Sequence, residues 1–135
     1  MKGISDLTSL GTVTGEALWP CSLLLADYLQ GEWWPEGPNT HVLELGCGLG
    51  LGGTVASIRL GASNGGKVVV TDGSSKVVSR AQRLLQRNKR ATDAPSCHEV
   101  LEWGNTSQIE RVRRCSSDGG GFALIIASDI LYKMS

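Results

Sequence analysis

A glycine-rich segment between an apolar strand pattern and a helix pattern most constrains what this chain can fold into. Its glycines are Gly46, Gly48 and Gly50, and the apolar run at 41–45 comes directly before them. Glycine permits a tight turn and lets a ligand approach the backbone without a Cβ in the way. Residues 51–60 then predict a helix, whose first turn offers unpaired N–H groups to that ligand. The segment therefore predicts a strand, a ligand-binding loop and a helix in succession.

Strand and helix patterns alternate along the rest of the chain. We expect strands at 41–45, 67–72, 97–101 and 122–127. We expect helices that begin near Trp19-Pro20, at Leu51, after a Ser74 or Ser75 cap, and at Ser107. Alternating strands and helices predict an α/β fold with a parallel sheet, flanking helices and right-handed crossovers. We interpret residues 1–135 as one domain, with an N-terminal segment and helix in 1–40 and the core in 41–135.

Composition narrows the classes of function. Charged residues make up 19% of the chain and the formal net charge is +0, so binding driven by nucleic-acid phosphates is not expected. No apolar run is long enough to cross a bilayer, and the start of the chain lacks an apolar signal core. The four cysteines form no C-x-x-C pair, so no metal site is predicted. We expect a reducing cytoplasmic location, with the nucleus as a further compartment.

The glycine loop alone does not decide which cofactor it holds. Gly48, Gly50 and Gly53 also satisfy the dinucleotide-binding pattern. Asp72 ends the second strand, where a carboxylate accepts hydrogen bonds from a ribose diol. Nicotinamide dinucleotides and S-adenosylmethionine both carry that diol. The alternative is that Asp72 caps the following helix.

Two residues favour S-adenosylmethionine. Glu44 lies two residues before Gly46, and a carboxylate there is costly beside an anionic pyrophosphate but tolerable beside a cationic sulfonium. Trp103 follows the third strand, where an indole can lie against adenine. The alternative for Trp103 is an ordinary position in the core or at its rim.

Four segments, taken in order, resemble a known family. They are Gly15–Pro20, Val42–Leu51, Leu101–Gly104 and Ala127–Tyr132. Together they resemble the lysine-methyltransferase-like members of the class I, seven-strand methyltransferases, which modify chaperones, elongation factors and similar proteins. The resemblance implies a Rossmann-like fold, S-adenosylmethionine as cofactor, and methyl transfer to a lysine side chain of a protein substrate.

The resemblance also implies roles for individual residues. It assigns cofactor binding to Trp19, Gly46, Cys47, Gly48, Asp72, Trp103 and Ser128, and we expect Glu44, Gly50 and Gly73 to belong to the same site. Trp19 would border the cofactor, and the glycine loop would contact its amino-acid portion. Asp72 would hold the ribose and Trp103 would stack on adenine. Cys47 and Leu49 stand where the family often has other small residues or threonine.

Asp129 and Tyr132 match the family's D-x-x-Y motif, and we expect both to be catalytic. Asp129 would orient the ammonium group of the lysine, and Tyr132 would line its channel with an aromatic face. Asp129 also ends a buried strand, at the edge where open α/β sheets bind ligands. The alternatives are a helix cap for Asp129 and simple packing against the sheet for Tyr132.

The family fold has seven strands, of which this sequence supplies the first four. We expect the chain to be C-terminally truncated, so that residues 122–127 form an apolar edge open to self-association. The alternatives are an edge covered by a partner and a non-catalytic, methyltransferase-like binding module. An NAD(P)-dependent oxidoreductase is also an alternative, but it leaves Trp103 and the Asp129-x-x-Tyr132 motif unexplained. A small-molecule or arginine acceptor stays open as well.

Overall fold

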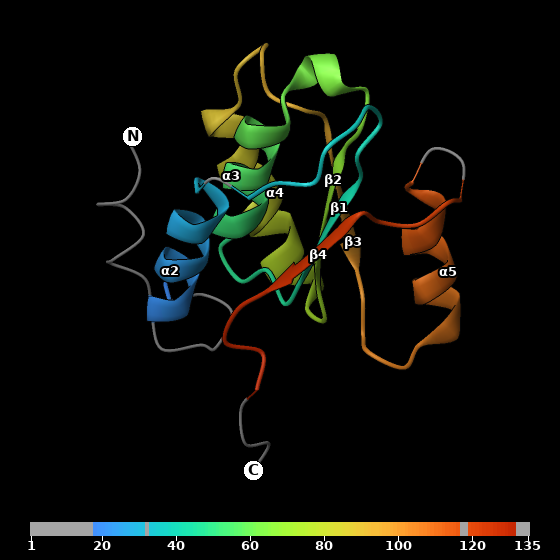
Figure 1. Cartoon of the computed structure of the whole chain (residues 1–135). Coiled ribbons are helices and arrows are strands. Elements are labelled where there is room, and N and C mark those ends of the chain that lie inside the picture. Colours follow the sequence, from blue (N-terminus) through green and yellow to red (C-terminus); the bar gives the residue numbers. More distant parts are fainter. Residues whose placement is uncertain (1–17, 32, 117–118, 132–135) are drawn as a thin grey trace.

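The computed structural model describes residues 18–31, 33–116 and 119–131, and it has a parallel sheet with helices on both faces (Figure 1). The strands are β1 (Val42–Leu45), β2 (Val68–Asp72), β3 (Ser96–Val100) and β4 (Leu124–Ala127). The helices are α2 (Pro20–Leu29), α3 (Leu51–Leu60), the short 3-10 helix η1 (Ala62–Asn64), α4 (Ser75–Asn88) and α5 (Thr106–Arg114). The predicted α/β class with a Rossmann-like arrangement is confirmed. Within the described ranges, no helix is both long and apolar enough to cross a membrane.

The residues that begin and end the helices explain why the predicted bounds lie close to the observed ones. Pro20 occupies the first turn of α2, and Gly61, with a φ of +74°, ends α3. Ser74 caps α4, because its hydroxyl oxygen accepts a hydrogen bond from the N–H of Val77 at 3.4 Å. The hairpin or strand considered for residues 1–15 lies outside the described residues.

The order of the strands in the sheet is β3-β2-β1-β4, and each neighbouring pair is parallel. The chain moves outward from β1 to β2 and β3, and then returns to place β4 on the other side of β1. The direction of progress therefore reverses between β1 and β4. Open α/β sheets bind ligands at the carboxyl ends of the strands beside such a reversal. In Figure 1 these ends lie at the lower edge of the sheet, where the glycine loop leaves β1.

Apolar side chains cover both faces of the central strands. On one face α2, α3 and α4 pack over Val42, Val68 and Val70, which have no exposed surface. On the other face a smaller cluster around Leu43 and Val69 lies beneath α5. Strand side chains alternate between faces, so a strand buried on both sides needs a nearly continuous apolar run. This explains the apolar runs of β1 and β2, which are buried on both faces.

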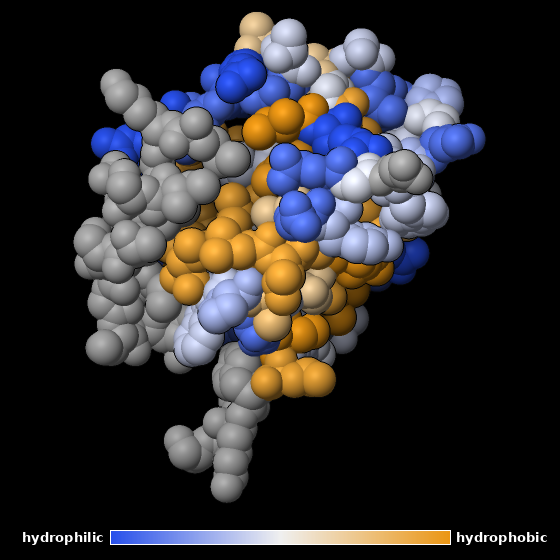
Figure 2. All heavy atoms as spheres, turned by 60° about the vertical axis from the view of Figure 1, so that its left-hand side comes forward, coloured by the Kyte–Doolittle hydropathy of each residue, from blue (hydrophilic) through white to orange (hydrophobic). Residues whose placement is uncertain are grey.

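Helix α2 buries only part of its apolar surface. Leu29 is buried and Leu25 is half-buried, whereas Leu24 is 68% exposed and Tyr28 is 63% exposed. The spacing of these four residues in the sequence predicts one shared apolar face, but only two of them pack inward. In Figure 2, the α2 side of the molecule is turned forward, and hydrophobic side chains gather on it. This side of the domain is thus unusually apolar for a surface.

Candidate functional site

The glycine loop is tied to the ends of β1 and β2. Its left-handed residues are Gly46, Gly48 and Gly50, with φ of +61°, +53° and +79°. The N–H of Cys47 donates to the carbonyl of Thr71 at 2.9 Å. The hydroxyl of Thr71 in turn donates to the carbonyl of Glu44 at 2.7 Å. These bonds hold the loop in a conformation that only glycine adopts without strain at the three positions.

Gly46 lies where three parts of the chain meet. A Cβ built on it would lie 2.9 Å from Cγ2 of Ile130 and 3.9 Å from Cζ2 of Trp103. A side chain at position 46 would therefore fill the space between the β1 end, the loop after β3 and the segment after β4. The structure brings Gly46 and Trp103 together, as predicted. It also adds Ile130, whose only sequence signal was its place between Asp129 and Tyr132.

Asp72 turns its carboxylate toward the glycine loop. Its Oδ2 accepts a hydrogen bond from the N–H of Gly48, and its Oδ1 accepts one from the N–H of Ser74, both at 3.2 Å. The side chain that caps α4 is Ser74, so capping does not account for Asp72. A carboxylate oxygen has a second lone pair and can accept a further hydrogen bond. Asp72 is thus suited to hold a diol at the end of β2.

Glu44 lies beneath the loop and supports it. Its side chain is 4% exposed, and its Oε2 accepts a hydrogen bond from the N–H of Gly53 at 2.8 Å. The N-cap residue of α3, Gly50, has no side chain to accept that bond, so Glu44 caps the helix from the sheet. Burial raises the pKa of Glu44 to about 8, which favours the neutral carboxylic acid at neutral pH.

The argument that a charged Glu44 disfavours a dinucleotide is therefore wrong, because Glu44 is neutral and turned inward. The backbone N–H groups of a dinucleotide-binding loop normally face the pyrophosphate. Here the N–H of Gly48 already faces the carboxylate of Asp72. Asp72 suits the ribose diol of a dinucleotide as well as that of S-adenosylmethionine, so this contact alone does not choose between the two cofactors.

The segment after β4 contacts the first turn of α2. Oδ2 of Asp129 accepts a hydrogen bond from the N–H of Cys21 at 3.3 Å, and the hydroxyls of Ser128 and Ser22 are 3.3 Å apart. Unpaired N–H groups and the helix dipole stabilise a carboxylate at a helix N-terminus. Asp129 has a φ of +51°, which is uncommon for a residue other than glycine. Asp129 thus accepts a hydrogen bond from the first turn of α2, whereas a helix after Asp129, which it was alternatively expected to cap, would lie outside the described residues.

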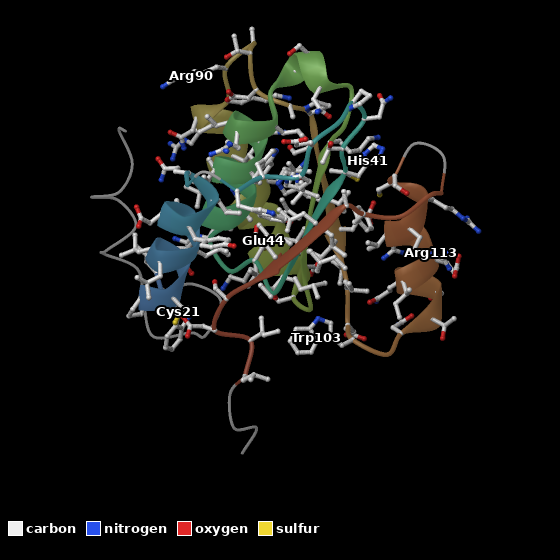
Figure 3. All side chains as sticks on the ribbon, viewed as in Figure 1. Cys21, His41, Glu44, Arg90, Trp103 and Arg113 are labelled. Carbon is white, nitrogen blue, oxygen red and sulfur yellow. The ribbon has the colours of Figure 1, made fainter. Side chains whose placement is uncertain are left out.

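Aromatic residues lie at the same end of the sheet. Trp19 is the N-cap residue of α2 and is 42% exposed, and Trp103 is 56% exposed. Figure 3 shows Trp103 and Cys21, from the start of α2, at the lower edge of the sheet, with His41 at the opposite end. Exposed indole faces beside a ligand-binding edge are suited to cover a purine.

Three further residues were predicted to belong to the site, and the structure describes two of them. Cys47 is buried, and its N–H and carbonyl both bond within the protein, so it shapes the loop. Gly73 is exposed between β2 and α4. Tyr132 lies outside the described residues, so its catalytic role stays a prediction.

The chemical types of the residues at this edge fit the parts of S-adenosylmethionine. Gly46 lets the loop approach Ile130 more closely than a residue with a Cβ could, and Asp72 presents a carboxylate beside the loop. Trp103 contributes an aromatic face near the same glycine. A small ligand with a diol, a flat base and a cationic end suits these three features.

Comparisons with known proteins agree with this geometry. A family model described as lysine methyltransferase matches residues 4–135. A calmodulin-lysine N-methyltransferase from Arabidopsis thaliana is 31% identical over 116 residues, which are 84% of this chain and 34% of that protein. The chain thus spans about a third of the length of this relative.

Proposed function

Because the chain belongs to the lysine methyltransferase family, we propose that it binds S-adenosylmethionine at the lower edge of the sheet and methylates a lysine of a protein. One observation carries the proposal. Gly46 lies against Ile130 and near Trp103, and the Asp72 carboxylate lies beside the same loop. The relative from Arabidopsis thaliana is named for calmodulin, which makes calmodulin the first substrate to test.

The chain's own residues bind and orient the reactants. When bound, S-adenosylmethionine would supply a methyl group on a sulfonium sulfur: the neutral amine of a lysine would bond to the methyl carbon in line, the C–S bond would break, and S-adenosylhomocysteine would leave. Asp72 accepts hydrogen bonds from the ribose hydroxyls, and Trp103 covers the adenine. Asp129 orients the lysine ammonium, which gives one proton to water before the transfer. Tyr132 lines the lysine channel. These assignments rest on the family motifs and on the position of the first three residues at one edge.

A methylation assay tests the proposal. The 135-residue chain is incubated with S-adenosylmethionine carrying a labelled methyl group, first with calmodulin and then with a mixture of cellular proteins. We expect label in protein, with methyllysine identified by peptide mass spectrometry. Asp72→Ala should lose the signal, whereas Glu110→Gln, an exposed substitution on α5, should keep it. Cofactor binding without methylation of any protein would favour the binding-module alternative.

Self-association through β4 and a cytoplasmic location are part of the same proposal. Among the described residues β4 pairs only with β1, and Ile125 on it is 58% exposed. Edge strands with exposed apolar side chains are prone to pair with another chain. Sedimentation at rising protein concentration tests this, and Ile125→Lys should reduce association.

The proposed cytoplasmic location rests on the cysteines. All four cysteines are free thiols, which suits a reducing compartment.

A further inference from the structure

Two cysteines that are far apart in the sequence meet between β3 and α5. Cys97 lies on β3 and Cys115 follows the last turn of α5, and their Sγ atoms are 3.1 Å apart. Glu99 shares a face of β3 with Cys97, because strand side chains alternate, and its Oε1 lies 3.9 Å from that Sγ. We propose that Cys97, Glu99 and Cys115 bind a thiophilic divalent cation such as Zn²⁺.

The three ligand atoms have suitable spacing. They all lie within 4.8 Å of one another. Zn–S bonds of about 2.3 Å in a tetrahedral site place two sulfurs about 3.8 Å apart. The observed separation of 3.1 Å between the Sγ atoms is shorter, so the two thiols need only a small outward movement. A water molecule or an added ligand completes the four positions that Zn²⁺ prefers.

The charges around the cluster also favour a cation. Two thiolates and one carboxylate around Zn²⁺ carry a net charge of about −1. The Nε of Arg111 donates to Oε2 of Glu99 at 2.9 Å, which balances that charge and leaves Oε1 for the metal. Metal-bound carboxylates are usually oriented by such a second hydrogen bond. Cys115 is at the C-terminal end of α5, where the helix dipole attracts positive charge.

The two thiol ligands determine which metal ions the site would bind. Two of the three ligands are thiols, and a bound cation displaces their protons because it is the thiolate that coordinates a metal. Zn²⁺ and similar ions bind thiolate strongly enough to do so, whereas Mg²⁺ and Ca²⁺ prefer oxygen ligands. The separation of 18 residues between the two cysteines explains why no C-x-x-C spacing predicted the site.

The site is distinct from the candidate cofactor site. Cys97 pairs in register with Val69 in the middle of β2, whereas Val100 at the end of β3 pairs with Asp72. A metal here would join α5 to β3 and steady the intervening loop, which carries Trp103. It would therefore act on the stability of α5 and take no part in methyl transfer.

Titration of the reduced 135-residue chain with Co²⁺ tests the proposal, because Co²⁺ reports tetrahedral thiolate binding through its charge-transfer and visible bands. We expect the bands to saturate at one equivalent and to disappear when Zn²⁺ displaces Co²⁺. The thermal midpoint should rise with Zn²⁺, since the metal binds the folded state.

Variants map the ligands. Cys97→Ser or Cys115→Ser should abolish the thiolate bands, and Cys21→Ser, which removes an exposed thiol on α2, should leave them unchanged. Arg111→Gln keeps all three ligands and should weaken Co²⁺ binding roughly 10- to 100-fold. A thermal melt without metal checks that each variant folds. Absence of the bands in the wild-type chain, or bands that persist in Cys115→Ser, would overturn the proposal. The proposal would also be overturned if Cys97 and Cys115 form a disulfide and the chain, once reduced, binds no Co²⁺.

Discussion

At the scale of single residues, Gly53 makes room for the buried carboxyl group of Glu44. A Cβ on Gly53 would lie 2.6 Å from Cγ2 of Val70 and 2.8 Å from Oε2 of Glu44. We expect Gly53→Ala to lower the free energy of unfolding by about 1–3 kcal/mol, because overpacking forces neighbours out of place. Urea unfolding measures this. Gly73→Ala is the matched control, since its Cβ would meet only Leu101 O, at 3.9 Å. Equal effects of the two substitutions would contradict the close packing at Gly53.

The raised pKa of Glu44 gives the stability a specific pH dependence. Its ordinary pKa of 4.5 applies to the unfolded chain, and burial raises the pKa to about 8 in the folded protein. Between these values the folded state holds one more proton than the unfolded state. The free energy of unfolding should therefore fall as pH rises through this window, by up to about 1.4 kcal/mol per pH unit, and level off above it.

Chemical unfolding at a series of pH values across that window measures the slope. Glu44→Gln keeps the shape of the side chain and an oxygen that accepts the Gly53 hydrogen bond, but it does not titrate. The variant should lose this part of the pH dependence. If the free energy of unfolding changes with pH equally in the variant and in the wild-type chain, Glu44 is ionised in the folded state and the account of its pKa is wrong.

Asp72 is the residue on which cofactor affinity should depend most directly. Loss of its charged hydrogen bonds to a ribose diol is expected to cost about 1–3 kcal/mol, or roughly 5- to 150-fold in affinity. Calorimetric titration of Asp72→Ala with S-adenosylmethionine measures this, with Glu110→Gln as an exposed acidic control. An affinity unchanged by Asp72→Ala would rule out its contact with the ribose.

Some site residues could be predicted from the sequence because they follow strands. Asp72 and Trp103 come just after β2 and β3, and the carboxyl ends of parallel strands share one edge. Ile130 and Ser22 could not be predicted, because their contacts join segments about a hundred residues apart. Glu44 was placed correctly beside the loop, but its inward turn depends on the N–H of Gly53.

At the scale of elements, the cap of α4 sets the direction in which the chain leaves β2. The hydroxyl oxygen of Ser74 accepts a hydrogen bond from the N–H of Val77 at 3.4 Å. We expect Ser74→Ala to lower the free energy of unfolding by about 1 kcal/mol, since an unpaired N–H remains in the first turn. Urea unfolding tests this against Ser79→Ala, an exposed serine within α4. A loss of stability in Ser79→Ala as large as in Ser74→Ala would contradict the capping role.

The buried face of a helix was easier to predict for α4, which has a strong amphipathic pattern, than for α2, which packs against another helix. On α4 the buried residues Val77, Val78, Ala81 and Leu85 repeat at helical spacing, and the sequence shows them directly. On α2 the apolar residues surround more of the helix, so the sequence did not show which of them pack on α3. Which side chains of α2 become buried depends on where α3 lies, and the spacing of residues along α2 gives no information about that.

At the scale of the whole molecule, the strand order explains why one edge carries the site. The return of the chain from β3 to β4 places the Ser128–Asp129 segment beside the glycine loop and the start of α2. The sequence indicated alternating strands and helices and hence a parallel sheet. The place of β4 beside β1 was not predicted, because alternation alone does not specify strand order.

Binding of S-adenosylmethionine by the wild-type chain tests the central claim most directly. We would titrate the 135-residue chain by calorimetry with S-adenosylmethionine and, separately, with NAD. Because the chain belongs to the lysine methyltransferase family and an indole lies near Gly46, we expect saturable binding of S-adenosylmethionine and much weaker binding of NAD. Preferential binding of NAD, or no binding of S-adenosylmethionine by a folded chain, would contradict the account.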